Sequence, residues 1–117
     1  MTISNHNGMT LLDLEPEGPR LGDDLHVNDV LGDAFGADAE IVVLPVSRID
    51  PAFFELRSGI AGEVFQKMEQ YQRRLVVLGD VAAEVAASKS LHDFVYETNR
   101  RGHHLFVPTR EEMLSRL

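Results

Sequence analysis

The sequence predicts a single-domain α/β sandwich: a mostly parallel sheet of four to five strands covered by about four helices. Two short apolar runs, Glu40–Val46 and Leu75–Leu78, have the composition of strands buried on both faces. Between them lies the clearest amphipathic helix of the chain, so this segment is expected to be a βαβ unit with parallel strands. A length of 117 residues fits one domain over 1–117.

In the first third, residues 1–8 are expected to form a flexible terminus, and Met9–Leu14 a first strand that ends at the proline-rich turn 15–19. A short extra strand near 19–22 is possible. Apolar residues at helical spacing predict a helix over about 24–35. Asp23 or Asp24 would be its N-cap, and Gly36 would end it.

The central helix is the best-defined element. Asp50 followed by proline predicts a first helical turn, and Ser58 is a candidate second N-cap for a helix restarting at Gly59 or Ile60. Glu63 and Lys67 would pair on its outer side. Its core face is expected to contain Ile60, Val64, Phe65, Met68 and Tyr71.

Beyond residue 80, segment 81–89 fits either a helical turn or a loop. A helix is expected from Ser88 or Ser90 to Gly102, with Ser90 and Asp93 resembling a capping box. His103–Val107 would be the fourth strand. Thr109 is the expected cap of a terminal helix.

Composition limits the function. Residues 1–40 carry nine acidic and one basic side chain, and residues 41–117 carry ten of each sign. The net charge of −8 makes nucleic-acid binding an unfavourable interpretation. No apolar run is long enough to span a membrane, no secretory signal is visible and no cysteine is present, so a cytoplasmic protein is expected.

The small residues around Ser58 allow two interpretations. Gly59 and Gly62 can simply let the helix approach the sheet closely. Alternatively, Ser58 lies at a helix N-terminus whose free amides can hold an anion, or a phosphate on the serine itself, with Arg57 beside it. The candidate switch or interaction surface comprises Arg57, Ser58, Gly59, Gly62 and Glu63.

The chain resembles two known families to different degrees. The motifs Leu56–Gly59, Ala61–Glu63, Gly79–Asp80 and Ser90–Asn99 resemble a bacterial family catalogued as domain of unknown function 4180, over most of residues 40–117. More distantly, the element order resembles the STAS domain of anti-sigma-factor antagonists. In that family the second serine of an Asp-Ser-Ser-Gly-Leu loop is phosphorylated to control binding to a kinase. Ser58, Gly59 and Ile60 match this loop, whereas Leu56 and Arg57 depart from it.

A second candidate site follows from the strand ends, where open α/β sheets bind ligands. Ser47, Arg48 and Asp80 come directly after apolar strands, and Asp80 could hold Mg²⁺ or accept a phosphoryl group. No metal site is expected from the histidines, because His103 and His104 would point to opposite sides of a strand. No nucleotide-binding or hydrolase motif is present, and no cofactor is expected.

The leading interpretation is a small regulatory module that binds an unidentified protein partner through the Ser58 surface and is not an enzyme. The alternative is an enzyme, or a domain binding a small ligand or anion, at the strand ends around Asp80. A homodimer held by exposed helix faces is the third possibility.

Overall fold

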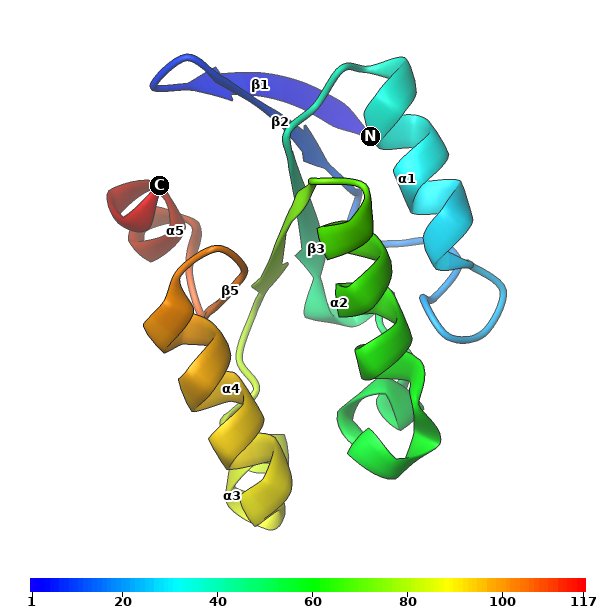
Figure 1. The fold of residues 1–117 in the computed structure, drawn as a ribbon, viewed down its shortest axis with the longest axis vertical. Coiled ribbons are helices and arrows are strands. Elements are labelled where there is room, and N and C mark those ends of the chain that lie inside the picture. Colours follow the sequence, from blue (N-terminus) through cyan, green and yellow to red (C-terminus); the bar gives the residue numbers. More distant parts are fainter.

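The computed structural model describes residues 1–117, which form one five-stranded sheet with helices on both faces (Figure 1). The strands lie side by side in chain order, β1-β2-β3-β4-β5. β1 and β2 are antiparallel, and each later strand is parallel to the strand before it. The predicted mostly parallel α/β sheet is therefore confirmed. The strands are Thr2–His6 (β1), Met9–Asp13 (β2), Ile41–Pro45 (β3), Arg74–Leu78 (β4) and Leu105–Val107 (β5).

Five α-helices and three short 3₁₀ turns connect or follow these strands. No helix has both the length and the apolar composition needed to cross a membrane. The 3₁₀ turns span 46–48, 51–54 and 56–58, between β3 and α2. The helices are Val27–Gly36 (α1), Ile60–Gln70 (α2), Ala82–Ala87 (α3), Lys89–Arg101 (α4) and Arg110–Arg116 (α5).

The N-terminal residues are ordered as a strand, so the expectation of a flexible segment 1–8 is wrong. All five residues of β1 pair with β2, from Thr2 opposite Asp13 to His6 opposite Met9. The turn between them consists of Asn7 and Gly8, both with positive φ (52° and 78°). Such a two-residue turn matches the twist of a hairpin, and Asn-Gly is its preferred sequence.

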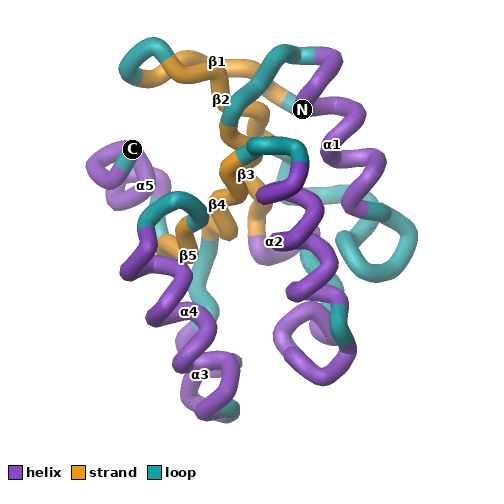
Figure 2. Tube along the Cα trace, viewed as in Figure 1, coloured by secondary structure: helices purple, strands orange, loops and turns teal.

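The larger part of the core lies between the sheet and helices α1, α2 and α4, which cover one face (Figure 2). Alternate strand residues point into it, as the period of two along a strand requires. Val42 and Val77 belong to this cluster, whereas Val43 and Val76 belong to the cluster on the opposite face. Strands covered on both faces therefore explain the continuous apolar runs in the sequence.

Helix α5 covers the second face of the sheet, where Met113 is fully buried. Two polar contacts tie α5 to the N-terminal hairpin. Arg110 forms an ion pair with Asp13 at 2.6 Å, and Nε2 of His6 donates to the carbonyl oxygen of Leu114 at 3.0 Å. Thr109 caps the helix by accepting from the amide of Glu112, as expected. The hairpin thus holds this helix from its first to its second turn.

One helix start and one capping box differ from expectation. The N-cap of α1 is His26, whose Nδ1 accepts from the amide of Asn28, because residues 20–25 first close a separate turn. The N-cap of α4 is Ser88, one of the two expected starts, and it accepts from the amide of Leu91. Ser90 therefore lies inside the helix, and the expected Ser90–Asp93 capping box does not form. Segment 81–89 is mostly helical as α3.

The central helix also shows two differences. Val64 and Met68 are buried as expected, but Tyr71 lies beyond the last helical residue and is 42% exposed, edge-on to Phe35. Glu63 pairs with His26 across the two helices at 3.2 Å, and no Glu63–Lys67 ion pair forms. The hydrophobic spacing identified the helix, but its partner helix determines which side chains pair.

Candidate functional site

Ser58 is exposed at the start of α2. Its hydroxyl donates to the carbonyl oxygen of Ala52 at 2.7 Å and accepts from the amide of Ile60 at 3.3 Å. The N-cap residue itself is Gly59, not Ser58, although the Ser58 hydroxyl still satisfies one of the free amides of α2. The positive end of the helix dipole therefore lies next to this hydroxyl, which favours negative charge there.

Neither Gly59 nor Gly62 serves close packing of α2 against the sheet. Gly59 has φ of +80°, a conformation that few other residues adopt, and this turns the chain from the 3₁₀ segment into α2. A Cβ at Gly62 would meet nothing within 4 Å, so the packing interpretation is wrong there. Ala61, which is fully buried, is the small residue that faces the core.

Two surface hollows flank the start of α2. A hollow of about 200 Å³ on the α1 side is lined by Ile60, Glu63 and His26, among others. A hollow of about 510 Å³ on the α4 side is lined by Arg57 together with Ser88 and Ser90. Arg57 and Glu63 therefore belong to opposite sides of this surface. Arg57 is exposed and takes part in none of the ion pairs of the structure.

The strand-end residues are engaged in local structure. Arg48 is only 8% exposed, and its guanidinium donates to the carbonyl oxygens of Glu15, Glu17 and Pro19. Ser47 donates to the carbonyl oxygen of another residue of the same loop, at 2.6 Å. These two side chains hold the loop that follows β2.

Asp80 is exposed and accepts from the amide of Ala82 at 2.8 Å, which starts α3. Neither Asp80 nor Arg48 lines any of five hollows on the surface, whereas Ser47 lines one of them, of about 200 Å³, with Glu84. Ser47, Arg48 and Asp80 therefore do not share one of these hollows.

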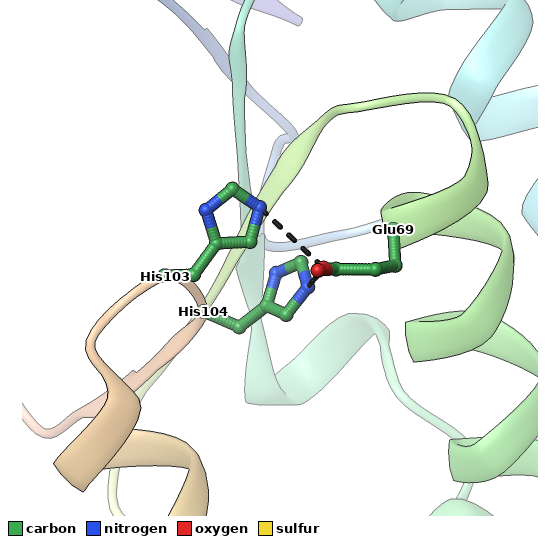
Figure 3. Close-up of side chains that lie close together, drawn as sticks. All are labelled: Glu69, His103 and His104. Atoms are coloured by element: carbon green, nitrogen blue, oxygen red, sulfur yellow. Dashed lines mark hydrogen bonds and ion pairs between the residues drawn. The ribbon is translucent and has the colours of Figure 1, made fainter.

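A third group of polar side chains lies near the amino end of β5. Glu69, near the end of α2, faces His103 and His104, which precede β5 (Figure 3). Oε2 of Glu69 lies 2.8 Å from Nε2 of His104 and 3.5 Å from Nε2 of His103. The expectation that the two histidines point apart is wrong, because they occupy a bend before the strand and their ring centroids are 4.5 Å apart.

Hydrogen bonding determines which ring nitrogen of the neutral His104 carries the proton. Its Nδ1 accepts from the backbone amide of Leu75 at 3.0 Å, so the proton of the neutral ring is on Nε2 and is donated to Glu69. Burial lowers the pKa of His104 below its ordinary value, and the charge of His103 acts in the same direction. The hydrogen bond to Glu69 opposes this shift without reversing it.

The potential ligand atoms of Glu69, His103 and His104 lie within 4.8 Å of one another, which is close enough for one metal ion. A histidine that binds a metal through Nε2 normally donates its other ring proton to an acceptor. Here a backbone N–H occupies that position, so His104 cannot bind a metal without giving up the Leu75 bond. Without His104 only His103 and Glu69 remain, and two side chains are fewer ligands than protein zinc sites use, so this geometry does not make a metal site.

Comparison with known families places this chain. A family model described as Domain of unknown function (DUF4180) matches residues 6–117. The chain belongs to the DUF4180 family. This match includes the N-terminal third as well as the motifs from Leu56 to Asn99. No curated protein and no solved structure matches this DUF4180 chain.

Sequence reasoning missed the cluster of Glu69, His103 and His104 in the DUF4180 chain. Glu69 is 34 and 35 residues from the two histidines, and no spacing rule connects such positions. The contact arises because β4 and β5 are neighbours and α2 leads directly into β4. The nearest sequence signal was Gly102, which ends α4 and so places the histidines in a bend.

Proposed function

We propose that the protein is a cytoplasmic regulatory module, not an enzyme, that binds a partner protein through the start of α2, with Ser58 as a phosphorylation switch. The observation that carries this proposal is the position of the Ser58 hydroxyl. It is exposed, it contacts the first amide of an 11-residue helix, and Arg57 beside it has no ion-pair partner. These features would stabilise a phosphate on Ser58.

The architecture supports the proposal. Strands β2, β3 and β4 are each followed by a helix on the same face, and this order resembles that of STAS domains. The helix after the second of these strands is α2, and Ser58 precedes it. We infer that the start of α2, with its two flanking hollows, is the surface where the partner binds.

Phosphorylation would change this surface in a defined way. The phosphate replaces the hydroxyl hydrogen, so the bond from Ser58 to the carbonyl oxygen of Ala52 is lost. The phosphate oxygens can accept from the Ile60 amide and from the Arg57 guanidinium instead. About two negative charges then lie on the surface that contacts the partner, and a partner that binds the neutral serine is released.

The test compares wild type, Ser58→Ala and Ser58→Asp, expressed in the native host, by intact-mass measurement and pull-down. Ser115→Ala is the matched control, because Ser115 is also exposed and its hydroxyl also donates to a backbone carbonyl. We expect a mass increase of about 80 Da that is absent from both Ser58 variants and kept by Ser115→Ala, and a partner that Ser58→Asp no longer captures. An unmodified protein whose variants all keep the same partners would show that Ser58 only stabilises the helix start.

A further inference from the structure

The two ring nitrogens of His104 contact two different elements of the fold. Nδ1 accepts from the amide of Leu75 in β4, and Nε2 donates to Glu69 in α2. The ring is also packed edge-on against Phe65 of α2, with centroids 5.2 Å apart. The His104 side chain is only 11% exposed, although Glu69 is 65% exposed. The imidazole therefore links α2, β4 and the bend before β5.

This link borders a hollow of about 300 Å³ between α2 and α4. Phe65 and Phe94 contribute apolar surface, and their rings are 5.4 Å apart. Glu69, His103 and His104 line the same hollow. A change in the position of the His104 ring would therefore change its shape.

Protonation is incompatible with the observed position of His104. A proton on Nδ1 would face the Leu75 N–H at a nitrogen–nitrogen distance of 3.0 Å, so two donors would oppose each other. The Leu75 amide would lose its acceptor. In exchange the imidazolium gains an ion pair with Glu69, but water screens a carboxylate that is this exposed. A buried amide without a partner is the larger effect.

We propose that His104 is a proton-sensitive latch. The neutral ring holds β4 and α2 together beside the hollow, and the protonated ring gives up its bond to β4 and changes the shape of the hollow between α2 and α4.

The cations around His104 favour the neutral ring, and one carboxylate opposes them. Glu69 on α2 is the acidic side chain in contact with it, and this carboxylate is mostly exposed. His103 in the bend and Arg74 on β4 both act against a positive charge on His104. Arg101 on α4 lines the same hollow and adds a further cation. Burial lowers the pKa of His104, and His103 and Arg74 act in the same direction, whereas Glu69 acts against the shift without reversing it.

The test is long-range ¹H–¹⁵N NMR of the full chain, which reports the protonation of each imidazole nitrogen. At about pH 7.5 we expect His104 with the proton on Nε2 and none on Nδ1. On acidification, its ring signals and the Leu75 amide signal should titrate with one midpoint below about 6.5. The hydrogen-exchange protection of Leu75 should fall about tenfold across that midpoint.

Two variants separate the latch from general acid sensitivity. In His104→Asn the side-chain oxygen can replace Nδ1 as acceptor but does not titrate, so Leu75 should keep its protection at about pH 5. Glu69→Gln keeps an acceptor for Nε2 and removes the charge, so the His104 midpoint should move lower. His103→Gln is the control, and it should leave the Nε2–H tautomer of His104 unchanged.

Three results of the NMR titration would overturn the proposal. They are a proton on Nδ1 at neutral pH, a midpoint at or above about 6.5, or a Leu75 amide that does not respond to the titration. Stoichiometric zinc that shifts the His104 ring nitrogens would also overturn it, because the cluster would then be a metal site. The wild-type spectra alone decide the first three outcomes if a variant fails to fold.

Discussion

Replacing Arg48 with alanine tests whether this residue supports the fold or belongs to a ligand site. Its guanidinium donates to the carbonyl oxygens of Pro19 at 2.6 Å, Glu15 at 3.0 Å and Glu17 at 3.4 Å. It also fills the space beside Gly18, where a Cβ would lie 2.8 Å from its central carbon. The loop 15–19 is thus wrapped around a buried cation.

The expected loss of stability follows from these bonds. Hydrogen bonds that involve a charged group contribute about 1.5–3 kcal/mol each, but the loop is exposed and water can replace part of what is lost. We therefore expect Arg48→Ala to lower the free energy of unfolding by about 2–3 kcal/mol. For 117 residues the entropy of unfolding is about 0.25 kcal/mol/K, so Tm should fall by about 8–12 °C.

Urea unfolding followed by circular dichroism, together with a thermal scan, measures both quantities. Arg20→Ala is the matched control, because Arg20 is an exposed arginine beside the same loop and its side chain makes no hydrogen bond or ion pair in the structure. Arg48→Lys should lie between the two, since an ammonium keeps the charge but lacks the planar fork of donors. An Arg48→Ala variant as stable as the Arg20→Ala control would refute the reasoning.

Three further predictions concern single contacts. Gly79→Ala should lower the free energy of unfolding, measured with urea, by about 2–4 kcal/mol, because Gly79 has φ of 142° and a Cβ would lie 2.8 Å from Val46. Gly36→Ala is the control: a Cβ there meets open space, so the free energy of unfolding should not change. Asn99→Ala should lower the free energy of unfolding by about 2 kcal/mol, because the Asn99 side chain forms hydrogen bonds with both the amide and the carbonyl of Phe106. Asn99→Asp keeps only the acceptor and should lower it less, and an equal loss for the two variants would contradict this. The pKa of His104 is lower in the folded protein than in the unfolded chain, so its contribution to stability is complete above about pH 6.5 and is lost as pH falls through the lowered value. Urea midpoints should therefore fall more on acidification for wild type than for His104→Asn, and identical slopes would refute this.

The parallel part of the fold was predictable because its signals are local. The apolar runs around Val42 and Val76 reflect burial on both faces, and proline or glycine marks their ends. The N-terminal hairpin was missed although Asn7–Gly8 is a strong turn signal, because β1 is rich in polar residues. Pairing with β2 holds β1 in a strand, although the composition of β1 does not indicate one.

The candidate sites were less predictable because their geometry depends on distant elements. Ser58 was placed within one residue of the α2 N-cap, which is Gly59, since the start of a helix depends on adjacent residues. The role of Arg48 depends on a loop about thirty residues earlier, and no spacing rule identifies carbonyl oxygens as partners. His104 depends on an amide in a neighbouring strand. Such contacts can be predicted only when the order of the strands in the sheet is known.

The position of α5 has a consequence for synthesis of the chain. Every strand precedes α5 in the chain, yet this helix alone covers the second face of the sheet. While the ribosome is still adding these residues, the side chains of Ile41, Val43 and Val76 have no helix over them. A nascent chain in this state exposes an apolar surface of the kind that chaperones bind.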